Sequence, residues 1–514
     1  MRRDCLRAAG AALLACAVLA APADAAERRD TTVTSFDGTQ IKTFFFPAPA
    51  LAAGERAPTV LSGHGWGMFG ARSAETDLMG LGAIGGIGIA DLQRAGYNVV
   101  TWDARGFGDS TGRAEIDSPD YEGRDVSAIL DWLATQPDAE LDGDGDPRMG
   151  MVGASYGGGI QFSAAAVDHR IDAIVPSIAW NTLERPLIPN GDLRMGWATG
   201  LLSIVRPFGI NPVAPQAYKD VLRTGRVRQS DYDWFLTRGP GERVRDITAP
   251  TLILQGTADT LFPLAEGVAN YQLLRQAGTP VKMAWFCGGH GLCTTNPGPS
   301  RTIGRATVDW LDRWVRERKQ VDTGDGFSWL ADDGQWRSAP EWPAPAGAPL
   351  TGDGRGRLGV RFGYSAGSGS AIGGAPAAGG VRVPVPVAGE ADVVGAPKLT
   401  LTYKGTAWPR RDTHVFAQVV QAEGLGGGNV AGGQATPIPV QLDGRSRAVT
   451  VDLEMVSLHV RPGQRLEVQL IDSSAMFDPQ RTSGRIDLQA HVELPTVTGA
   501  RIASSEGPAP GGAL

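Results

Sequence analysis

The sequence predicts an α/β domain with a mostly parallel sheet, followed by an all-β domain. From Thr31 to about Pro280, short β-rich runs alternate with stretches whose apolar residues recur at helical spacing. Strands that alternate with helices are typical of a parallel sheet covered by helices. Beyond about residue 325, segments alternate apolar and polar residues between turn residues, which is the pattern of an antiparallel sandwich.

The first domain is expected to span residues 26–325. Its predicted strands are Thr31–Phe36, Ile41–Phe46, Thr59–Ser62, Asn98–Asp103, Met149–Gly153, Ile171–Val175, Thr251–Gln255 and Val281–Phe286. Its predicted covering helices are Asp125–Leu133, Gly157–Val167, Leu264–Gln276 and Ile303–Val315. Residues 181–247 have no strand character, and they interrupt the alternation in a way that indicates a helical cap.

The second domain is expected to span residues 326–494 as an antiparallel β-sandwich. Its predicted strands are Lys398–Tyr403, His414–Val420, Arg447–Leu453, Gln464–Ile471 and Gly484–Val492. Residues 345–390 are rich in Gly, Ala, Pro and Ser, as linkers and loops are, and residues 495–514 are predicted to be a flexible tail.

The N-terminus has the pattern of a secretory signal peptide. Arginines precede an apolar run from Ala8 to Ala21, and Ala23-Asp24-Ala25 has the small-x-small form that signal peptidase accepts. We therefore expect residues 1–25 to be removed and the protein to be secreted, without a stable membrane span, since no later segment reaches about 18 consecutive apolar residues. Lipoprotein anchoring at Cys16 is the less favoured alternative, because the apolar run continues past that cysteine.

Charge and composition exclude some classes of partner. Lysine and arginine number 48 against 55 acids, a net charge of -7, so nothing drives binding to nucleic acid, and a small-molecule or peptide substrate is expected instead. The run from Asp142 to Asp146 begins like a calcium loop but lacks the later glutamate, which favours a solvated turn. No cofactor or metal is predicted, and the oligomeric state is left open.

The strongest motif is Gly153-Ala154-Ser155-Tyr156-Gly157-Gly158, which follows an apolar strand and precedes a helix. This is a nucleophile elbow in the context that it requires, because a sharp strand-to-helix turn exposes the serine hydroxyl and small neighbours relieve the crowding. The turn also places the Tyr156 amide at a helix N-terminus, where an unpaired N–H stabilises developing negative charge. Ser155 is therefore the predicted nucleophile.

A serine nucleophile requires a base and an orienting acid. Asp259 and His290 each follow a predicted strand, and the order Ser, Asp, His is the one used by hydrolases with this elbow. The second oxyanion donor is expected from Gly63-His64-Gly65-Trp66-Gly67, and we assign it to the Trp66 N–H, with His64 supporting the loop. The run from Asp103 to Ser110 is interpreted as a structural turn.

The cysteines Cys287 and Cys293 flank His290, and an exported chain favours a disulfide between them. The glycines between them allow the necessary chain reversal. Free buried thiols are the alternative. A zinc site is disfavoured because two cysteines and one histidine leave too few ligands.

Together the elbow, the cap and the C-terminal sandwich resemble the Xaa-Pro dipeptidyl-peptidase and cocaine-esterase-like serine hydrolases over about residues 30–495. The resemblance implies an α/β-hydrolase body, a helical cap over the active site and a jelly-roll domain that helps to wall the pocket. It also implies that Ser155, Asp259 and His290 form the triad. One departure is that residues 62–70 contain no tyrosine, whereas that family commonly uses a tyrosine hydroxyl from this loop as the second oxyanion donor.

The predicted function is a secreted serine hydrolase that cleaves an amide or ester bond, with Xaa-Pro dipeptidyl-peptidase and carboxylesterase activities both open. A non-catalytic exported binding protein is the third hypothesis. A dipeptidyl peptidase needs an acidic group in the cap to bind the free amine of its substrate, and the sequence does not rank the candidates, which are Glu184, Asp192, Asp220, Asp231 and Asp233.

Overall fold

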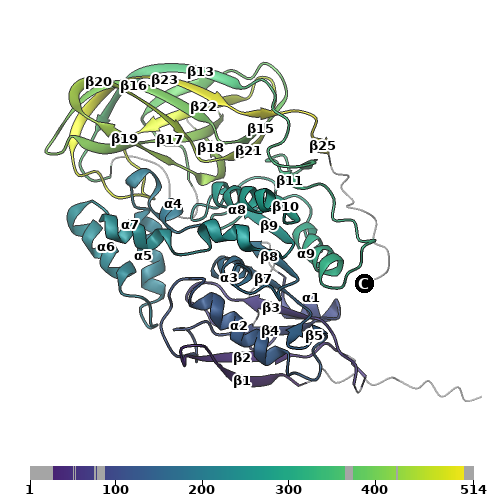
Figure 1. Cartoon of the computed structure of the whole chain (residues 1–514). Helices are drawn as coiled ribbons and strands as arrows, with labels where there is room; N and C mark the ends of the chain where they lie inside the picture. Colours follow the sequence, from purple (N-terminus) through teal and green to yellow (C-terminus); the bar gives the residue numbers. More distant parts are fainter. Residues whose placement is uncertain are drawn as a thin grey trace, which may run out of the picture.

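The computed structural model describes residues 27–49, 51–52, 54–74, 77, 87–364, 374–423 and 427–502. The predicted signal peptide, Cys16 and the end of the predicted tail lie outside these residues. Figure 1 shows the β-sandwich packed above the sheet and helices of the first domain, with the cap helices at the left, beside the first domain and below the sandwich.

A mixed eleven-stranded sheet forms the centre of the first domain. In spatial order its strands are β1 (Arg29–Thr34), β2 (Gln40–Phe46), β4 (Asn98–Trp102), β3 (Thr59–Gly63), β7 (Met149–Ala154), β8 (Ala173–Ser177), β9 (Thr251–Gly256), β10 (Val281–Phe286), β11 (Phe327–Leu330), β12 (Trp336–Ala339) and β25 (Arg501–Ile502). In this spatial order, the strands from β4 to β11 run parallel to one another.

Helices cover both faces of this sheet. One apolar cluster joins one face to α2 (Glu122–Leu133), α3 (Tyr156–Ala165) and α8 (Leu264–Ala277), and another joins the opposite face to α1 (Ile89–Arg94) and α9 (Thr302–Trp314). The strands between these layers are buried along their length, because a parallel sheet that is covered on both sides has no solvent face. This is the predicted α/β architecture, and it is confirmed.

The cap lies between β8 and β9, where it was predicted. It consists of α4 (Glu184–Leu187), η2 (Pro189–Gly191), α5 (Met195–Ile204), α6 (Val213–Thr224), α7 (Gln229–Leu236) and η3 (Gly241–Asp246). Apolar residues of these helices form one cluster with Phe107, Tyr156 and Phe262 of the body. The cap is therefore packed directly over the elbow.

The second domain is a β-sandwich with a core of its own. One sheet contains β13 (Leu350–Val360), β23 (Ser483–Leu494), β16 (Lys398–Trp408) and β20 (Asp443–Asp452). The facing sheet contains β14 (Val381–Val385), β22 (Arg465–Ile471), β17 (Asp412–Glu423), β18 (Gly427–Val430) and β19 (Thr436–Gln441). A smaller sheet contains β21 (Val456–Val460), β15 (Ala391–Gly395) and β24 (Thr496–Val497), and the short 3₁₀ helix η4 (Ala431–Gly433) precedes β19.

The structure differs from the expected linker at 345–390. The segment contains β13, which pairs along its whole length with β23, and β14, which packs on β13. The glycines at 352, 354 and 356 lie on one face of β13, and a Cβ at Gly352 would lie 2.4 Å from the Pro384 carbonyl oxygen. These glycines allow close packing of two strands, so here a Gly-rich composition does not indicate a linker.

The main sheet also extends beyond the expected boundary at 325. β11 pairs with β10 in parallel, and Phe327 and Trp329 are fully buried. β24 and β25 pair with β15 and β12, so the described start of the expected flexible tail is paired in sheets. The Asp142–Asp146 run forms a hairpin of β5 (Leu141–Gly143) and β6 (Asp146–Pro147). Among the described helices, none is long and apolar enough to cross a membrane.

Candidate active site

Ser155 occupies a sharp turn between β7 and α3. Its backbone has φ 57° and ψ −119°, in the left-handed region that disfavours a side chain, and its N–H donates to the Ser177 carbonyl at 2.9 Å. A Cβ at Gly157 would lie 2.2 Å from the Gly63 carbonyl oxygen. The turn therefore requires glycine at 157, because backbone of the neighbouring strand occupies the space that a side chain would need.

The structure brings Ser155, His290 and Asp259 into one hydrogen-bonded chain. The Ser155 Oγ lies 2.8 Å from His290 Nε2, and His290 Nδ1 lies 2.8 Å from Asp259 Oδ2 and 2.9 Å from Oδ1. The carboxylate accepts from Nδ1–H, so Nε2 carries the lone pair that accepts the serine proton. This geometry is the one in which a histidine acts as general base toward a serine.

The Asp259 carboxylate is fully buried and its orientation is restricted by backbone donors. Its Oδ1 accepts the N–H groups of Leu261 at 3.0 Å and Phe262 at 2.7 Å. The Phe262 ring packs edge-on against the His290 ring with centroids 5.1 Å apart. Asp259 and His290, the predicted acid and base, therefore share one packed unit at the ends of β9 and β10.

The loop that carries His290 lies against the Asp259 loop, backbone to backbone. The Gly291 N–H donates to the Ala258 carbonyl at 3.0 Å, and a Cβ at Gly289 would lie 2.6 Å from the Asp259 Cβ. The predicted disulfide between Cys287 and Cys293 is present, with Cα atoms 5.3 Å apart. It closes the loop on both sides of His290.

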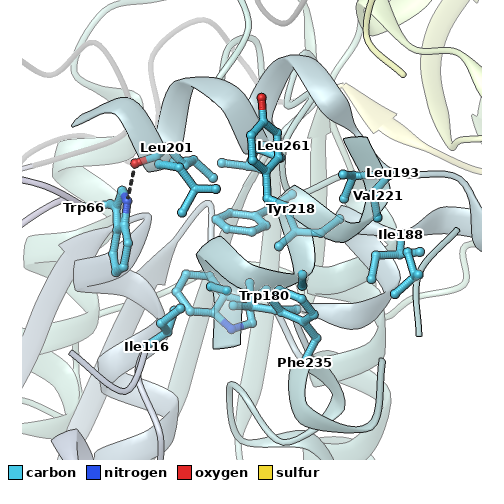
Figure 2. Close-up of a pocket in the computed structure, with 18 of the residues that line it drawn as sticks. Trp66, Ile116, Trp180, Ile188, Leu193, Leu201, Tyr218, Val221, Phe235 and Leu261 are labelled. Atoms are coloured by element: carbon cyan, nitrogen blue, oxygen red, sulfur yellow. Dashed lines mark hydrogen bonds between the residues drawn. The ribbon is translucent and has the colours of Figure 1, made fainter. Parts of the chain in front are cut away.

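The two predicted oxyanion donors lie near the serine. Tyr156 is the first residue of α3, so its N–H has no partner within the helix. The Trp66 ring contacts the Tyr156 ring edge-on with centroids 5.2 Å apart, and its indole N–H donates to the Leu201 carbonyl of the cap at 3.2 Å (Figure 2). Trp66 therefore lines the site, and its backbone N–H as an oxyanion donor stays a prediction.

His64 has the supporting position that the sequence indicated. The Ala104 N–H donates to its Nε2 at 3.0 Å, so Nδ1 carries the proton and donates to the Gly65 carbonyl at 2.8 Å. Burial lowers the pKa of the His64 imidazole, which keeps the ring neutral in this bridge. The Asp103–Ser110 run is a turn in which Asp103 Oδ2 accepts the Asp109 N–H at 2.8 Å.

Buried carboxyl groups support the elbow from the body side, and sequence reasoning missed them. Glu122 accepts the N–H groups of Glu115 at 2.6 Å and Ser118 at 3.0 Å, and it lies 3.4 Å from the Tyr156 hydroxyl. Burial raises the pKa of Glu122 to about 7. No local motif marks Glu122, because its importance comes from segments that meet only in the fold.

An apolar cavity of about 90 Å³ lies between the cap and Ser155. Figure 2 shows its side chains converging from the body and the cap. Among the residues that the structure describes, its lining contains no charged side chain, and the polar side chains in it, other than tryptophan indoles, are those of Ser155, Tyr156 and Tyr218. Representative apolar residues of the lining are Trp66, Ile116, Trp180, Leu193, Leu201 and Phe235.

The acidic cap residues considered for amine binding are not among the residues that line this cavity. Glu184 accepts the Tyr232 hydroxyl, and Asp220 and Asp231 pair with Arg228. Asp233 accepts from Gln229 at 2.7 Å. Asp192 lies instead in a second, polar cleft of about 750 Å³ between the cap and the sandwich.

Comparison with known proteins gives a family match within the first domain. Residues 37–291 match the model of the X-Pro dipeptidyl-peptidase (S15) family. An uncharacterized 31.7 kDa protein of Escherichia coli is 36% identical over 86 residues, which are 17% of this chain and 28% of that protein. Human protein ABHD12B is 29% identical over 217 residues, which are 40% of this chain and 51% of that protein. The chain thus spans between about a quarter and a half of these curated relatives.

Solved structures match almost the whole chain. A CocE/NonD family hydrolase from Staphylococcus aureus has a TM-score of 0.66 at 15% identity and covers 91% of this chain and 94% of its own. An α-amino acid ester hydrolase has a TM-score of 0.67 at 13% identity and covers 95% and 100%. An aminopeptidase from a marine sediment Thaumarchaeota archaeon has a TM-score of 0.67 at 13% identity and covers 92% and 96%.

At these identities the structures show a shared fold of hydrolase body and β domain, and the family model covers the body that carries the elbow, the acid and the base. The resemblance seen in the sequence is confirmed. The body of this chain, residues 37–291, belongs to the X-Pro dipeptidyl-peptidase (S15) family of hydrolases, and the whole chain shares its fold with a CocE/NonD family hydrolase and an α-amino acid ester hydrolase.

Proposed function

We propose that this hydrolase uses Ser155, His290 and Asp259 to cleave esters of small, uncharged apolar acids. The observation that carries the proposal is that the Ser155–His290–Asp259 hydrogen-bonded chain opens onto a cavity whose described lining residues carry no charged side chain. A serine placed in this way reacts with a carbonyl, and an apolar cavity stabilises an apolar acyl group through burial.

The reaction proceeds through an acyl-enzyme. The Ser155 Oγ attacks the ester carbonyl carbon while His290 Nε2 accepts the serine proton, and Asp259 stabilises the imidazolium. His290 then gives that proton to the leaving alkoxide as the ester C–O bond breaks. Water next attacks the acyl carbon and gives a proton to His290, which returns it to Ser155 Oγ as the acid departs.

The negative charge on the carbonyl oxygen requires donors at each step. We assign the first donor to the Tyr156 N–H at the start of α3 and the second to the Trp66 N–H. The packing of the Trp66 ring on Tyr156, with its indole bound to Leu201, supports a fixed position for this loop. Removal of one such donor typically costs about 10² to 10³ in turnover.

The lining favours an ester over a dipeptide substrate. A dipeptidyl peptidase must neutralise a substrate ammonium, and burial of an unpaired cation costs several kcal/mol. The described residues of the apolar lining supply no carboxylate, and of the cap acids Asp220 and Asp231 pair with Arg228. Of the two chemistries that the sequence leaves open, carboxylester hydrolysis therefore fits the cavity better.

We also propose that the protein works outside the cytoplasm. The N-terminal pattern of residues 1–25 and the Cys287–Cys293 disulfide support export, because such bonds persist in oxidising surroundings. Cell fractionation with a signal-peptide deletion tests the idea. Export that is unchanged after removal of residues 2–25 would contradict it.

The test of activity compares nitrophenyl acetate, butyrate and octanoate with Ala-Pro nitroanilide. We expect hydrolysis of the esters, with the short acyl groups preferred, and little release from the anilide. Efficient cleavage of Ala-Pro nitroanilide with poor ester hydrolysis would favour the peptidase. A protein that turns over neither substrate and does not react with a fluorophosphonate would support the non-catalytic alternative.

A further inference from the structure

We infer that the β-sandwich holds the catalytic acid in place through Gln434, and through Glu454 acting on the cap residue Arg194. All three side chains lie outside the apolar cavity, and the contacts of Gln434 and Arg194 end on the backbone of the Asp259 loop. They are positioning residues, because they act through Asp259 and not on the substrate. The inference rests on the proposed role of Asp259.

Gln434 makes the direct contact between the sandwich and the acid. Its Nε2 donates to the backbone carbonyl of Asp259 at 2.5 Å, and the side chain is buried. At the neighbouring Gly432, a Cβ would lie 2.3 Å from the carbonyl oxygen of Thr257. Backbone and side chain of this sandwich segment therefore both lie against the loop that carries the acid.

Arg194 makes the second contact and joins three parts of the molecule. It belongs to the cap, it is fully buried, and its guanidinium donates to the Thr260 carbonyl at 2.9 Å while pairing with the Glu454 carboxylate of the sandwich. A buried guanidinium requires a carboxylate partner, since an unpaired buried charge costs several kcal/mol. Glu454 thus holds the Arg194 side chain in place, and Arg194 in turn holds the backbone of Thr260, which follows Asp259.

The same region also packs on the base. The Trp197 indole N–H donates to Thr260 Oγ1 at 3.2 Å, and the Trp197 ring contacts the His290 ring edge-on with centroids 5.7 Å apart. A shift of the Asp259 loop would therefore change both the direction of the carboxylate and the place of the imidazole. Misplacement of about 1 Å in a catalytic group costs up to about 10²-fold in rate.

The test uses Gln434→Leu and Glu454→Leu in the full chain. We expect kcat to fall about 10- to 100-fold with KM nearly unchanged, and the rate of fluorophosphonate labelling of Ser155 to fall in parallel. The acid limb of the pH–rate profile should move to lower pH, because a displaced carboxylate stabilises the imidazolium less. Glu454→Gln keeps an oxygen acceptor for Arg194 but removes the negative charge, so its kcat should lie between those of Glu454→Leu and the wild type.

Two matched variants distinguish a loss of positioning of the Asp259 loop from a general weakening of the sandwich or of its contact with the cap. Arg481 also joins the sandwich to the cap, donating to the Val221 carbonyl at 3.0 Å, but no described contact of its side chain reaches the Asp259 loop. Gln418 is a buried sandwich glutamine that donates to Gln469 at 2.7 Å. Arg481→Met and Gln418→Leu should keep the kcat of the folded protein.

Rates are normalised to the folded fraction measured by circular dichroism. Wild-type turnover by Gln434→Leu and Glu454→Leu, or an equal loss in Arg481→Met, would overturn the inference while leaving the proposed function intact. Wild-type protein that fails to label at Ser155 would instead defeat the proposed function, which separates the two failures.

Discussion

The two halves of the site are held in different ways. The half that contains Ser155, the proposed nucleophile, depends on contacts within the body, where Gly63 and Gly157 bring β3 and α3 into backbone contact. The acid half receives contacts from the cap and the sandwich, through Arg194 and Gln434. The elbow thus depends on contacts within the body, whereas the position of Asp259 also depends on the cap and the sandwich.

Because of this difference, we expect substitutions in the two halves to affect turnover to different extents. A change at the elbow acts directly on the nucleophile, and the backbone around it leaves no space for relaxation. A change in the sandwich reaches the chemistry only through the Asp259 loop, so it should reduce turnover without removing it.

The largest effect is expected at Ser155. Ser155→Ala should reduce turnover by about 10⁶-fold while the unfolding temperature changes little, because the hydroxyl contributes to the reaction and little to packing. The measurement is ester hydrolysis beside thermal unfolding. Hydrolysis at the wild-type rate would exclude Ser155 as the nucleophile.

Asp259→Asn is expected to cost about 10⁴-fold in kcat. The asparagine fits the same space but favours the wrong tautomer of His290, because its amide offers a donor where the carboxylate accepts. Steady-state kinetics over pH 6–9 provide the measurement. A loss of less than about tenfold would point to a different acid.

The elbow contact predicts a loss for Gly157→Ala. The added Cβ would lie 2.2 Å from the Gly63 carbonyl oxygen, so β3 and α3 must separate and the serine must move. We expect about 10²-fold lower turnover and lower stability. Gly304→Ala in α9, whose Cβ meets nothing within 4 Å, is the matched control and should keep activity. Equal behaviour of the two variants would contradict the packing argument.

The apolar cavity predicts that a smaller side chain in its wall changes the preference for the length of the acyl chain. Ile188 and Val227 line both the apolar cavity and the polar cleft between cap and sandwich, so they form part of the wall between them. Ile188→Ala should raise the ratio of kcat/KM for octanoate over butyrate esters by about tenfold. An unchanged ratio, with both esters still hydrolysed, would show that the acyl chain does not approach this wall.

The smallest effect concerns the pH dependence of the free energy of unfolding, through the buried carboxyl group of Glu266. Burial raises the pKa of Glu266 on α8 to about 7, and its Oε2 accepts the Asn181 N–H at 2.9 Å. The folded state therefore binds more protons than the unfolded state between about pH 4.5 and 7, so this residue lowers stability as pH rises through that window. Glu266→Gln should remove this loss, by at most about 3 kcal/mol at pH 8, without changing kcat.

Thermal unfolding of wild type and Glu266→Gln from pH 5 to pH 8 gives the comparison. The gap between the two curves should widen as the pH rises. A constant gap would show that Glu266 does not titrate in this range.

The sequence predicts the parts of the site that depend on local chemistry. Ser155 is recognisable because its glycines and its strand-to-helix context lie within a few residues, and Asp259 and His290 because each follows a β-rich run. Glu122, Gln434 and Arg194 carry no such signal, since each acts on a segment distant in sequence. The same reasoning explains β13, whose glycines resemble a linker until β14 is seen to pack on them.

Mass spectrometry of the protein after reaction with a fluorophosphonate is the most direct test of the hydrogen-bonded chain from Ser155 to Asp259. We expect a single adduct on Ser155, no adduct in His290→Ala, and protection by a butyrate ester present during labelling. Labelling at another residue, or labelling of Ser155 at the same rate in His290→Ala, would contradict the proposal that this hydrogen-bonded chain activates the serine.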